Sequence, residues 1–336
     1  MSAKVAVAIL NWNGVALLKQ YLPSVLRHTS RELAEVVVID NGSNDGSLEW
    51  LKQQYPTVRV VALDHNYGFA GGYNRGIAAL EHEYLLLLNS DVEVTPQWIE
   101  PLLAEIERSP KIVAVQPKIL SYRERTMYEY AGAEGGYMDW LGYPFCRGRI
   151  FDTIEEDRGQ YGEEPKEVFW TTGACMLVRR RCYMEAGGLD ENFFAHQEEI
   201  DLAWRWKSIG LQLWVVPQSI VYHYGGASLD ASDPHKTFLN FRNNLWMLWK
   251  LLPSRKLGGI LFCRFCLDLL AMVVFLVSGK IGDAWAVLRA WGAFLRRRPK
   301  RERKWGRERA YPHLYQHSLL WRYHICRERL FSQLKR

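Results

Sequence analysis

The sequence predicts an α/β fold in which helices cover both faces of a mostly parallel sheet. Short apolar runs rich in Val, Ile and Leu occur at residues 4–10, 35–39, 58–63 and 84–88. Segments that fit helices, such as residues 15–28 and 96–108, separate these runs. Fully apolar strands that alternate with helices are typical of a parallel sheet buried on both faces.

Polar residues follow directly after these apolar runs. They form the clusters Asn11–Gly14, Asp40–Gly46, Asn66–Gly76 and Asn89–Asp91. Because such a sheet binds ligands at the carboxyl ends of its strands, the clusters predict one binding edge. Asn11 and Asn13 are the candidate ligand contacts of the first cluster.

The triplet Asn89-Ser90-Asp91 follows a run of four leucines. A carboxylate and an amide oxygen two residues apart suit a hard divalent cation that also bridges two phosphates. An Asx turn that caps the next helix is the alternative interpretation of the triplet.

The second and third clusters fit contacts to a nucleotide. Asp40 suits a base N–H, and Ser43 suits a ribose or phosphate, whereas Asp45 is expected to cap the next helix. Asn74 and Arg75 lie in a glycine-rich stretch that lets the backbone approach a ligand, and Arg75 suits a phosphate. This stretch lacks the GxGxxG dinucleotide pattern.

An acidic cluster lies later in the chain, at the start of a predicted helix over residues 198–208. Its carboxylates, Glu198, Glu199 and Asp201, are predicted to raise one another's pKa, which suits a general base. The alternative for Asp201 is an ion pair with Arg205 one helical turn on. His223, at the end of a predicted strand, suits a metal or phosphate; a structural role is its alternative.

The C-terminal part differs in composition. Residues 251–336 carry 19 Lys and Arg against 5 Asp and Glu, a net charge of +14, which leaves −8 for residues 1–250. Residues 258–279 are apolar apart from Arg264 and Asp268, which can pair on one helix face and make a spanning helix expensive. An interfacial or re-entrant helix is favoured over a spanning one.

Two further segments of this tail favour a membrane surface. Residues 282–295 are amphipathic, and residues 296–309 hold nine basic and two acidic side chains, suited to anionic headgroups. Nucleic-acid binding is the alternative interpretation of these charges, but we predict an anionic membrane surface and no nucleic acid as the partner. We therefore expect a catalytic domain over residues 1–250 and a membrane-associating helical region over residues 251–336.

Six irregularly spaced cysteines indicate a reducing compartment. The N-terminus shows no signal-peptide pattern, so export is not expected. The predicted location is the cytoplasmic side of a membrane, peripheral or monotopic.

Seven stretches carry a resemblance to a known family. They are VAVAILNWNG, VVVIDNGSNDGS, NYGFAGGYNRGI, LLLLNSDVEV, TTGACMLVRR, FFAHQEEIDLAWR and VYHYGGAS. Together, over roughly residues 4–228, they resemble the family 2 glycosyltransferases of the GT-A fold, especially the bacterial rhamnosyltransferase-like branch. This resemblance implies a Rossmann-like nucleotide-sugar-binding domain.

The resemblance also implies that Asp40 contacts the nucleotide base. The full set of predicted donor nucleotide contacts is Asn11, Asn13, Asp40, Ser43, Asn74, Arg75, Asn89 and Ser90. Asp91 and His223 hold Mg²⁺ or Mn²⁺ on the donor diphosphate. Thr172, Gly173, Glu198 and Asp201 lie on the acceptor side, and Glu199 is the catalytic base.

This chain departs from the family pattern at three places. Glu199 stands where the family commonly has Asp, and Asn89 stands where many members have a first Asp. The Gln-x-x-Arg-Trp motif of processive members is incomplete, since only Arg205-Trp206 is present. The last departure predicts the addition of one sugar rather than a polymer.

The expected activity is an inverting single displacement. One sugar moves from a nucleotide-diphosphate donor, dTDP-rhamnose or a UDP-sugar, to a hydroxyl of a glycan or lipid-linked acceptor in cell-surface polysaccharide synthesis. The rival classes are a sugar nucleotidyltransferase, whose glycine-rich loop after the first strand is absent, and a GT-A-like binding protein without turnover.

Overall fold

The computed structural model describes residues 3–225, 233–302, 304–305 and 307–334. Residues 226–228 of the last family-like stretch, and Arg303 and Gly306 of the basic run, lie outside the described residues.

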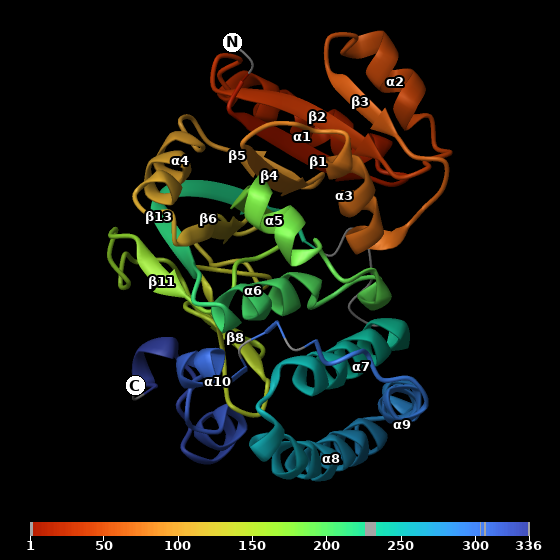
Figure 1. Ribbon diagram of the computed structural model, residues 1–336, viewed down its shortest axis with the longest axis vertical. Helices are drawn as coiled ribbons and strands as arrows, with labels where there is room; N and C mark the ends of the chain where they lie inside the picture. Colours follow the sequence, from red (N-terminus) through yellow and green to blue (C-terminus); the bar gives the residue numbers. More distant parts are fainter. Residues whose placement is uncertain (1–2, 226–232, 303, 306, 335–336) are drawn as a thin grey trace.

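A nine-stranded sheet forms the centre of the molecule (Figure 1). Its strands are β1 (Val5–Asn11), β2 (Ala34–Asp40), β3 (Arg59–Ala62), β4 (Tyr84–Asn89), β5 (Val92–Val94), β6 (Ile112–Ser121), β11 (Lys166–Val168), β12 (Cys175–Arg179) and β13 (Gln212–His223). The order is β11-β13-β6-β12-β4-β1-β2-β3, with β5 paired to β13. Strands β3, β2, β1 and β4 are mutually parallel, as predicted, whereas β12 runs antiparallel to both of its neighbours.

Alternate residues of β1 face opposite sides of this sheet. Val5 and Val7 belong to the core beneath helices α1 and α4, while Ala6 and Ala8 belong to the core beneath α3 and α6. The helices of this part are α1 (Val15–His28), α2 (Ser47–Gln54), α3 (Gly68–Ala78), α4 (Glu100–Glu107), α5 (Arg180–Ala186) and α6 (Glu198–Ser208), with a 3₁₀ turn, η1 (Glu191–Phe193). Burial on both faces explains why the strand sequences lack polar alternation.

Two local predictions differ from the structure. The helix expected over residues 96–108 begins only at Glu100, because residues 92–94 form β5 and a turn follows. Residues 119–167, expected as irregular loops, include a four-stranded sheet of β7 (Gly136–Met138), β8 (Pro144–Cys146), β9 (Arg149–Ile150) and β10 (Thr153–Ile154). These strands are two or three residues long, too short for a readable alternation.

The C-terminal helices form a layer below the sheet (Figure 1). They are α7 (Pro234–Leu251), α8 (Ser254–Val277) and α9 (Ile281–Arg296), followed by α10 (Arg307–Ala310), η2 (Tyr311–His313), η3 (Trp321–Ile325) and η4 (Phe331–Gln333). The domain boundary predicted after residue 250 falls at the end of α7. Helix α7 packs against α9 and α8, and also against α6, so the boundary stays a prediction.

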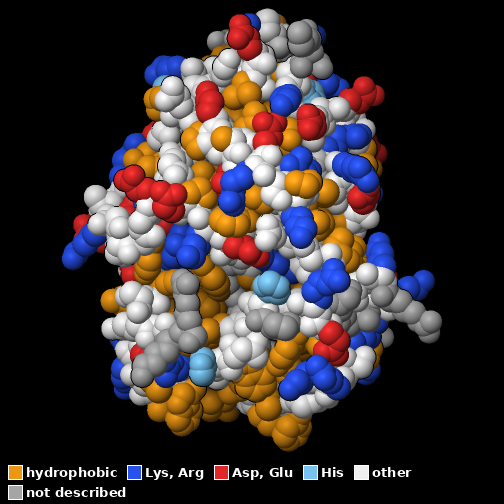
Figure 2. Space-filling model, turned by 60° about the vertical axis from the view of Figure 1, so that its left-hand side comes forward, with side chains coloured by type: hydrophobic (Ala, Val, Ile, Leu, Met, Phe, Trp, Pro, Cys, Tyr) orange, Lys and Arg blue, Asp and Glu red, His pale blue; other side chains and the backbone are white. Residues whose placement is uncertain are grey.

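Helix α8 is long and apolar enough to cross a membrane by length and composition, the one such helix among the described residues. The predicted pairing of its two charges is confirmed, since Arg264 Nη2 lies 3.3 Å from Asp268 Oδ1. Both side chains are buried against the protein. The opposite face of α8 is apolar and exposed, and the lower end of the molecule is accordingly dominated by hydrophobic side chains (Figure 2).

Part of the basic run is used inside the fold. The Arg301 guanidinium donates to the carbonyls of Trp249 and Leu252, which fastens the run to the end of α7. Arg309 donates to the carbonyl of Ile209. By contrast, Arg296, Arg297 and Arg298 are exposed.

Candidate functional site

The carboxyl ends of β1, β2 and β4 bring three predicted residues to one edge. Asn11 pairs in register with Asp40, and Leu10, one residue earlier, pairs with Asn89. Parallel strands in register end together, so polar residues that follow them become neighbours. This explains how positions up to 78 residues apart meet.

A hydrogen-bonded cluster occupies the β1–β2 part of this edge. The buried Asn11 amide donates to Asp40 Oδ2 at 2.9 Å and to Ser43 Oγ at 3.2 Å. Asp40 Oδ1 accepts from the Ser43 N–H, and the Asn13 N–H donates to Ser43 Oγ. The structure therefore brings Asn11, Asn13, Asp40 and Ser43 together.

Asp45 lies outside this cluster and holds two helices. One carboxylate oxygen accepts from the Ser47 N–H at the start of α2, and the other accepts from the Val15 N–H at the start of α1. Asp45 therefore bonds the first N–H of both helices, although the N-cap position of α2 is Gly46, which makes no side-chain cap.

Asp91 and His223 form the second part of the edge. The chain turns after β4 through Asn89 and Ser90 into Asp91, and β13 delivers His223 beside it. His223 Nε2 lies 3.1 Å from Asp91 Oδ1, and Asn89 Nδ2 lies 3.4 Å from the same nitrogen. Both Asp91 and His223 are buried.

Glu129, which was not among the predicted site residues, completes this arrangement. Its Oε2 lies 3.4 Å from His223 Nδ1, so the two imidazole nitrogens face two carboxylates. Residues around Glu129 carry no motif, and no pattern in the sequence connects Glu129 to His223. Second carboxylates that orient metal-binding histidines are a general feature of metal sites.

The charges of this group are coupled. Burial disfavours the imidazolium of His223, but Glu129 and Asp91 outweigh burial and raise its pKa to about 10. Burial also opposes ionisation of Asp91, yet His223 holds the Asp91 pKa below its ordinary value. Without a metal, the pair is therefore an imidazolium beside a carboxylate.

The geometry of this pair fits a divalent cation. Octahedral ligands at about 2.1 Å lie about 3 Å apart, and the Asp91 oxygen and His223 nitrogen have this spacing. Among the described residues no group of three or more His, Cys, Asp or Glu side chains is placed to hold a metal ion. A cation here would take two protein ligands and need further ones from a bound ligand.

The acidic cluster and the Asn89–Asp91 loop are linked through residues 173–174. A side chain at Gly173 would contact Glu199 Cβ at 4.0 Å, and the next carbonyl, that of Ala174, accepts the Asn89 N–H. Thr172 is buried, and its hydroxyl donates to the Ala131 carbonyl. The start of α6 and the Asn89–Asp91 loop therefore both lie beside residues 173–174, just before β12.

Glu198 and Glu199 differ in environment from ordinary helix-start acids. Burial raises the pKa of the half-buried Glu199 to about 7. Burial, followed by the charge of Glu199, raises the pKa of Glu198. Like-charge repulsion thus raises the pKa of Glu198, whereas burial raises that of Glu199; the mutual effect that the sequence predicts is found on Glu198.

One Glu198 oxygen, Oε2, is buried without a hydrogen-bond partner among the described residues. A buried carboxylate oxygen without a donor is costly unless a ligand supplies one.

Asp201 is tied to structural partners. It lies 2.8 Å from Arg205 Nε and 2.7 Å from Lys250 Nζ, and its side chain is fully buried. The predicted helix pair with Arg205 is confirmed. No described contact directs Asp201 toward a ligand.

Asn74 and Arg75 hold the loop before α6. The Asn74 amide bonds the Leu189 main chain through both its oxygen and its nitrogen. Arg75 lies 2.8 Å from Glu191 Oε2 and stacks on Tyr67, rather than standing free for a phosphate. Their contact with a donor stays a prediction.

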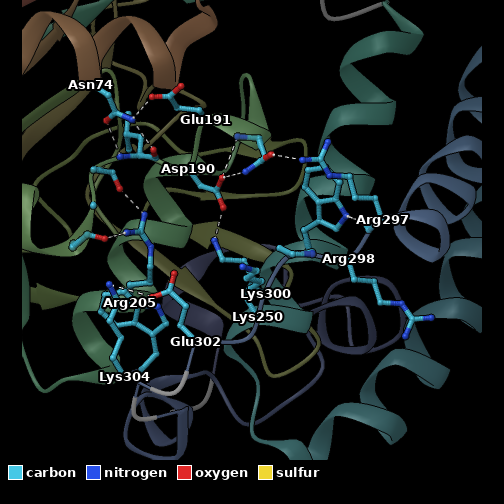
Figure 3. A pocket seen from close by; sticks show the side chains of 18 residues that line it. Asn74, Asp190, Glu191, Arg205, Lys250, Arg297, Arg298, Lys300, Glu302 and Lys304 are labelled. Carbon is cyan, nitrogen blue, oxygen red and sulfur yellow. Dashed lines mark hydrogen bonds and ion pairs between the residues drawn. The ribbon is translucent and has the colours of Figure 1, made fainter.

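Asn74 and Glu191 also line a recess of about 650 Å³ (Figure 3). Six basic and three acidic side chains line it: Arg205, Lys250, Arg297, Arg298, Lys300 and Lys304, with Asp190, Glu191 and Glu302. Lys250 and Arg205 are buried in carboxylate pairs, whereas Arg297 and Arg298 are exposed at its rim. The recess is therefore predominantly cationic.

The fold and the polar edge at the carboxyl ends of this mostly parallel sheet are those expected of a GT-A-type transferase. The model of the family described as Glycosyl transferase family 2 matches residues 6–186. The chain belongs to this family and is a glycosyltransferase.

Similar proteins agree with this assignment. The chain is 30% identical over 279 residues to an N-acetylglucosaminyl-diphospho-decaprenol L-rhamnosyltransferase of Mycobacterium tuberculosis, covering 74% of this chain and 89% of that protein. It is 30% identical over 215 residues to the O-antigen biosynthesis protein RfbC of Myxococcus xanthus, covering 63% of this chain and 16% of that protein. The predicted rhamnosyltransferase-like resemblance is confirmed.

A solved structure shows the same fold. GalNAc-T7 with UDP, GalNAc and Mn²⁺ superposes with a TM-score of 0.59 at 20% sequence identity, over 76% of this chain and 49% of that chain. The predicted GT-A fold is confirmed.

Proposed function

We propose that this glycosyltransferase moves one sugar, with inversion, from a nucleotide-diphosphate donor to a hydroxyl of a lipid-linked or glycan acceptor in surface polysaccharide synthesis. The observation that carries the proposal is that the Asn89–Asp91 loop and the start of α6 both lie beside residues 173–174, just before β12. The Asp91–His223 pair suits a metal–diphosphate, and the half-buried Glu199 suits a base.

The donor nucleotide would bind across the β1–β2 end. Asp40 and Asn11 would face the base, with Asn13 and Ser43 beside the ribose, and Asn89 and Ser90 would line the diphosphate. The Asn11 oxygen Oδ1 is buried without a protein partner among the described residues, which favours an N–H donor from a ligand.

Mg²⁺ or Mn²⁺, held by Asp91 and His223, would supply charge stabilisation for the departing nucleoside diphosphate. The Mn²⁺ in the GalNAc-T7 structure supports a divalent cation in this fold. Glu129 would keep the His223 ring oriented, with Nε2 directed to Asp91.

Glu199 would take the proton of the acceptor hydroxyl as its oxygen attacks the anomeric carbon from the face opposite the leaving group. Its pKa of about 7 suits a base that works near neutral pH. Glu198 would accept a hydrogen bond from the acceptor through its partnerless oxygen, and Thr172 and Gly173 would shape the acceptor side. Asp201 would support the start of α6 from within.

The relatives support the acceptor and the location. One relative is named for a diphospho-decaprenol acceptor and another for O-antigen biosynthesis, so a lipid-linked acceptor and dTDP-rhamnose or a UDP-sugar are the proposed substrates. The exposed apolar face of α8 and α9 favours peripheral or monotopic binding at the cytoplasmic side of a membrane. The cations at the rim of the recess would attract anionic lipid rather than nucleic acid.

A donor panel tests the proposal. The enzyme is incubated with Mn²⁺ and dTDP-rhamnose, UDP-GlcNAc or UDP-galactose, with and without membrane lipid extract, and nucleoside diphosphate release is measured. We expect acceptor-dependent release from one donor. Donor binding without release would favour the non-catalytic alternative, and release of pyrophosphate from a nucleoside triphosphate would favour a nucleotidyltransferase.

A further inference from the structure

The turn before the catalytic helix α6 is strained. Phe194, His196 and Gln197 have φ values of 66°, 70° and 69°, a backbone region that residues other than glycine rarely adopt. Such a turn persists only when the surrounding structure fixes it. Glu198 and Glu199 follow directly, so the shape of this turn sets where their carboxylates point.

Asn243 of α7 fixes the first part of the turn. This side chain is fully buried, and its amide nitrogen, with two N–H donors, lies 3.1, 2.8 and 2.8 Å from the carbonyl oxygens of Phe193, Ala195 and His196. Its amide oxygen accepts from Arg242, which itself donates to the Phe193 carbonyl. Hydrogen bonds from Asn243 and Arg242 therefore hold the strained segment in place.

Asn244 fixes the last residue of the turn. Its amide nitrogen donates to Gln197 Oε1 at 2.9 Å and to the Gly142 carbonyl at 2.7 Å. The Gln197 carbonyl in turn accepts the Asp201 N–H, a bond of the first turn of α6. Asn244 thus holds the residue that directly precedes Glu198, the first residue of α6.

The same asparagine reaches the apolar helix α8. Its amide oxygen accepts from Arg264 Nη1, and Arg264 pairs with Asp268. The Trp291 indole of α9 donates to Asp268 at 3.0 Å. A continuous buried polar chain therefore runs from α9 and α8 through Asn244 to Gln197.

We propose that Asn243 and Asn244 are positioning residues that hold Glu199 in its working place and tie the acidic turn to the apolar α8–α9 layer. The inference rests on the proposed function, because it takes Glu199 as the base. Neither asparagine would touch substrate. A displacement of about 1 Å at a reacting group costs on the order of 10²-fold in rate, so a relaxed turn is expected to act on catalysis and not on the donor edge.

The test compares Asn243→Ala, Asn244→Asp and Thr237→Val in the full chain. Asn244→Asp keeps an acceptor for Arg264 but removes the donor to Gln197. Thr237 bonds Asp283 of α9 from the same helix without touching the turn, which makes it the matched control. Measurements are turnover with the active donor and acceptor, affinity for UDP and dTDP with Mn²⁺, and hydrogen exchange of residues 193–199.

We expect both asparagine variants to lose about 10²-fold in kcat with nucleotide affinity unchanged, and to exchange faster at residues 193–199. Thr237→Val should match the wild type in all three measurements. If a folded Asn243→Ala and Asn244→Asp keep wild-type kcat and exchange while Glu199→Gln is impaired, the positioning inference is wrong. If Glu199→Gln itself has wild-type kcat, the base assignment fails, and the positioning role fails with it.

Discussion

His223 lies between two carboxylates, and this makes its charge depend on what occupies the site. Glu129 and Asp91 raise its pKa against the effect of burial, so the metal-free ring carries a proton. An imidazole binds a metal in its neutral form, and cation binding at His223 therefore displaces that proton. The same three side chains would serve as an ion-paired cluster when empty and as a metal site when a nucleotide diphosphate arrives.

Asp91→Ala tests this assignment. The substitution removes the one carboxylate of the Asn89-Ser90-Asp91 triplet and should abolish transfer and the Mn²⁺ dependence of UDP or dTDP binding, measured by calorimetry with and without Mn²⁺. Asp45→Ala is the control, expected to lose about 1 kcal/mol of unfolding free energy while keeping metal dependence. Near-normal turnover of Asp91→Ala would overturn the site.

Ionisation of the Glu199 carboxyl group should lower the free energy of unfolding. Burial raises its pKa from the ordinary glutamate value of 4.5 to about 7 in the folded protein, so the folded state binds the proton more tightly than the unfolded state. The resulting penalty is absent below pH 4.5, grows between the two pKa values and is complete above pH 7. Glu199→Gln should therefore raise the melting temperature at pH 8 and leave it nearly unchanged at pH 4. An equal change at both pH values would contradict the buried-charge explanation.

Helix α3 illustrates how an element is fixed by one close contact. A Cβ at Gly76 would come within 2.4–2.6 Å of three Ile39 side-chain carbons of β2, so only glycine lets α3 lie this close to the sheet. Gly258 in α8, by contrast, is exposed and has no neighbour within 4 Å of such a Cβ.

Gly76→Ala should therefore cost about 1–3 kcal/mol, because the core would be overpacked. Gly258→Ala should be neutral or stabilise by up to about 1 kcal/mol, because alanine is the better helix former. Urea denaturation measures both. A neutral Gly76→Ala would show that α3 does not pack on β2 as described.

Elements whose own sequence determines them could be predicted. Strands β1, β2 and β4 lie within one residue of their predicted ranges, and α1 coincides with its range, because each has a strong apolar pattern. Strands β7–β10 could not be predicted, because contacts with residues as distant as Leu319 and Phe331 hold them. Glu129 and Asn243 were missed for the same reason: their partners are far away in the sequence.

The site was predictable where chemistry lies in a local motif. Asn11, Asp40 and Ser43 meet as the strand ends suggested, and Asp91 meets His223. The engagement of Arg75 by Glu191, and of Asp201 by Lys250, depends on loops and helices that pack only in the folded chain. Side-chain partners of that kind leave no periodic signal.

The two ends of the molecule differ: the strands of the proposed nucleotide edge, β1, β2 and β4, lie in the upper part, and an apolar surface lies at the lower end (Figures 1 and 2). The exposed apolar side chains of α8 and α9 include Phe262, Val274, Ile281 and Trp285. Their neighbours Arg264 and Asp268 face inward, so α8 can lie along a membrane with its charges covered by protein. This arrangement favours the in-plane interpretation of α8 over a spanning one.

Vesicle flotation tests membrane binding by the apolar end. The protein should float with anionic phospholipid vesicles at low salt and less at high salt, because exposed Arg side chains contribute screened attraction. A Phe262→Ser, Val274→Ser, Trp285→Ser variant should not float, whereas Val60→Ser, an exposed position on β3, should behave as wild type. Absence of flotation at low salt would contradict membrane association.

The central claim is that Glu199 removes the acceptor proton beside a metal-bound donor. The measurement is the turnover of Glu199→Gln with the active donor, together with its affinity for UDP or dTDP and Mn²⁺, against Asp201→Asn as the structural control. We predict a loss of about 10²–10⁴-fold in kcat for Glu199→Gln with unchanged nucleotide affinity, and a loss mainly of stability for Asp201→Asn. A fully active Glu199→Gln beside an inactive Glu198→Gln would move the base to Glu198, and full activity of all three variants would contradict a catalytic role for the acidic cluster.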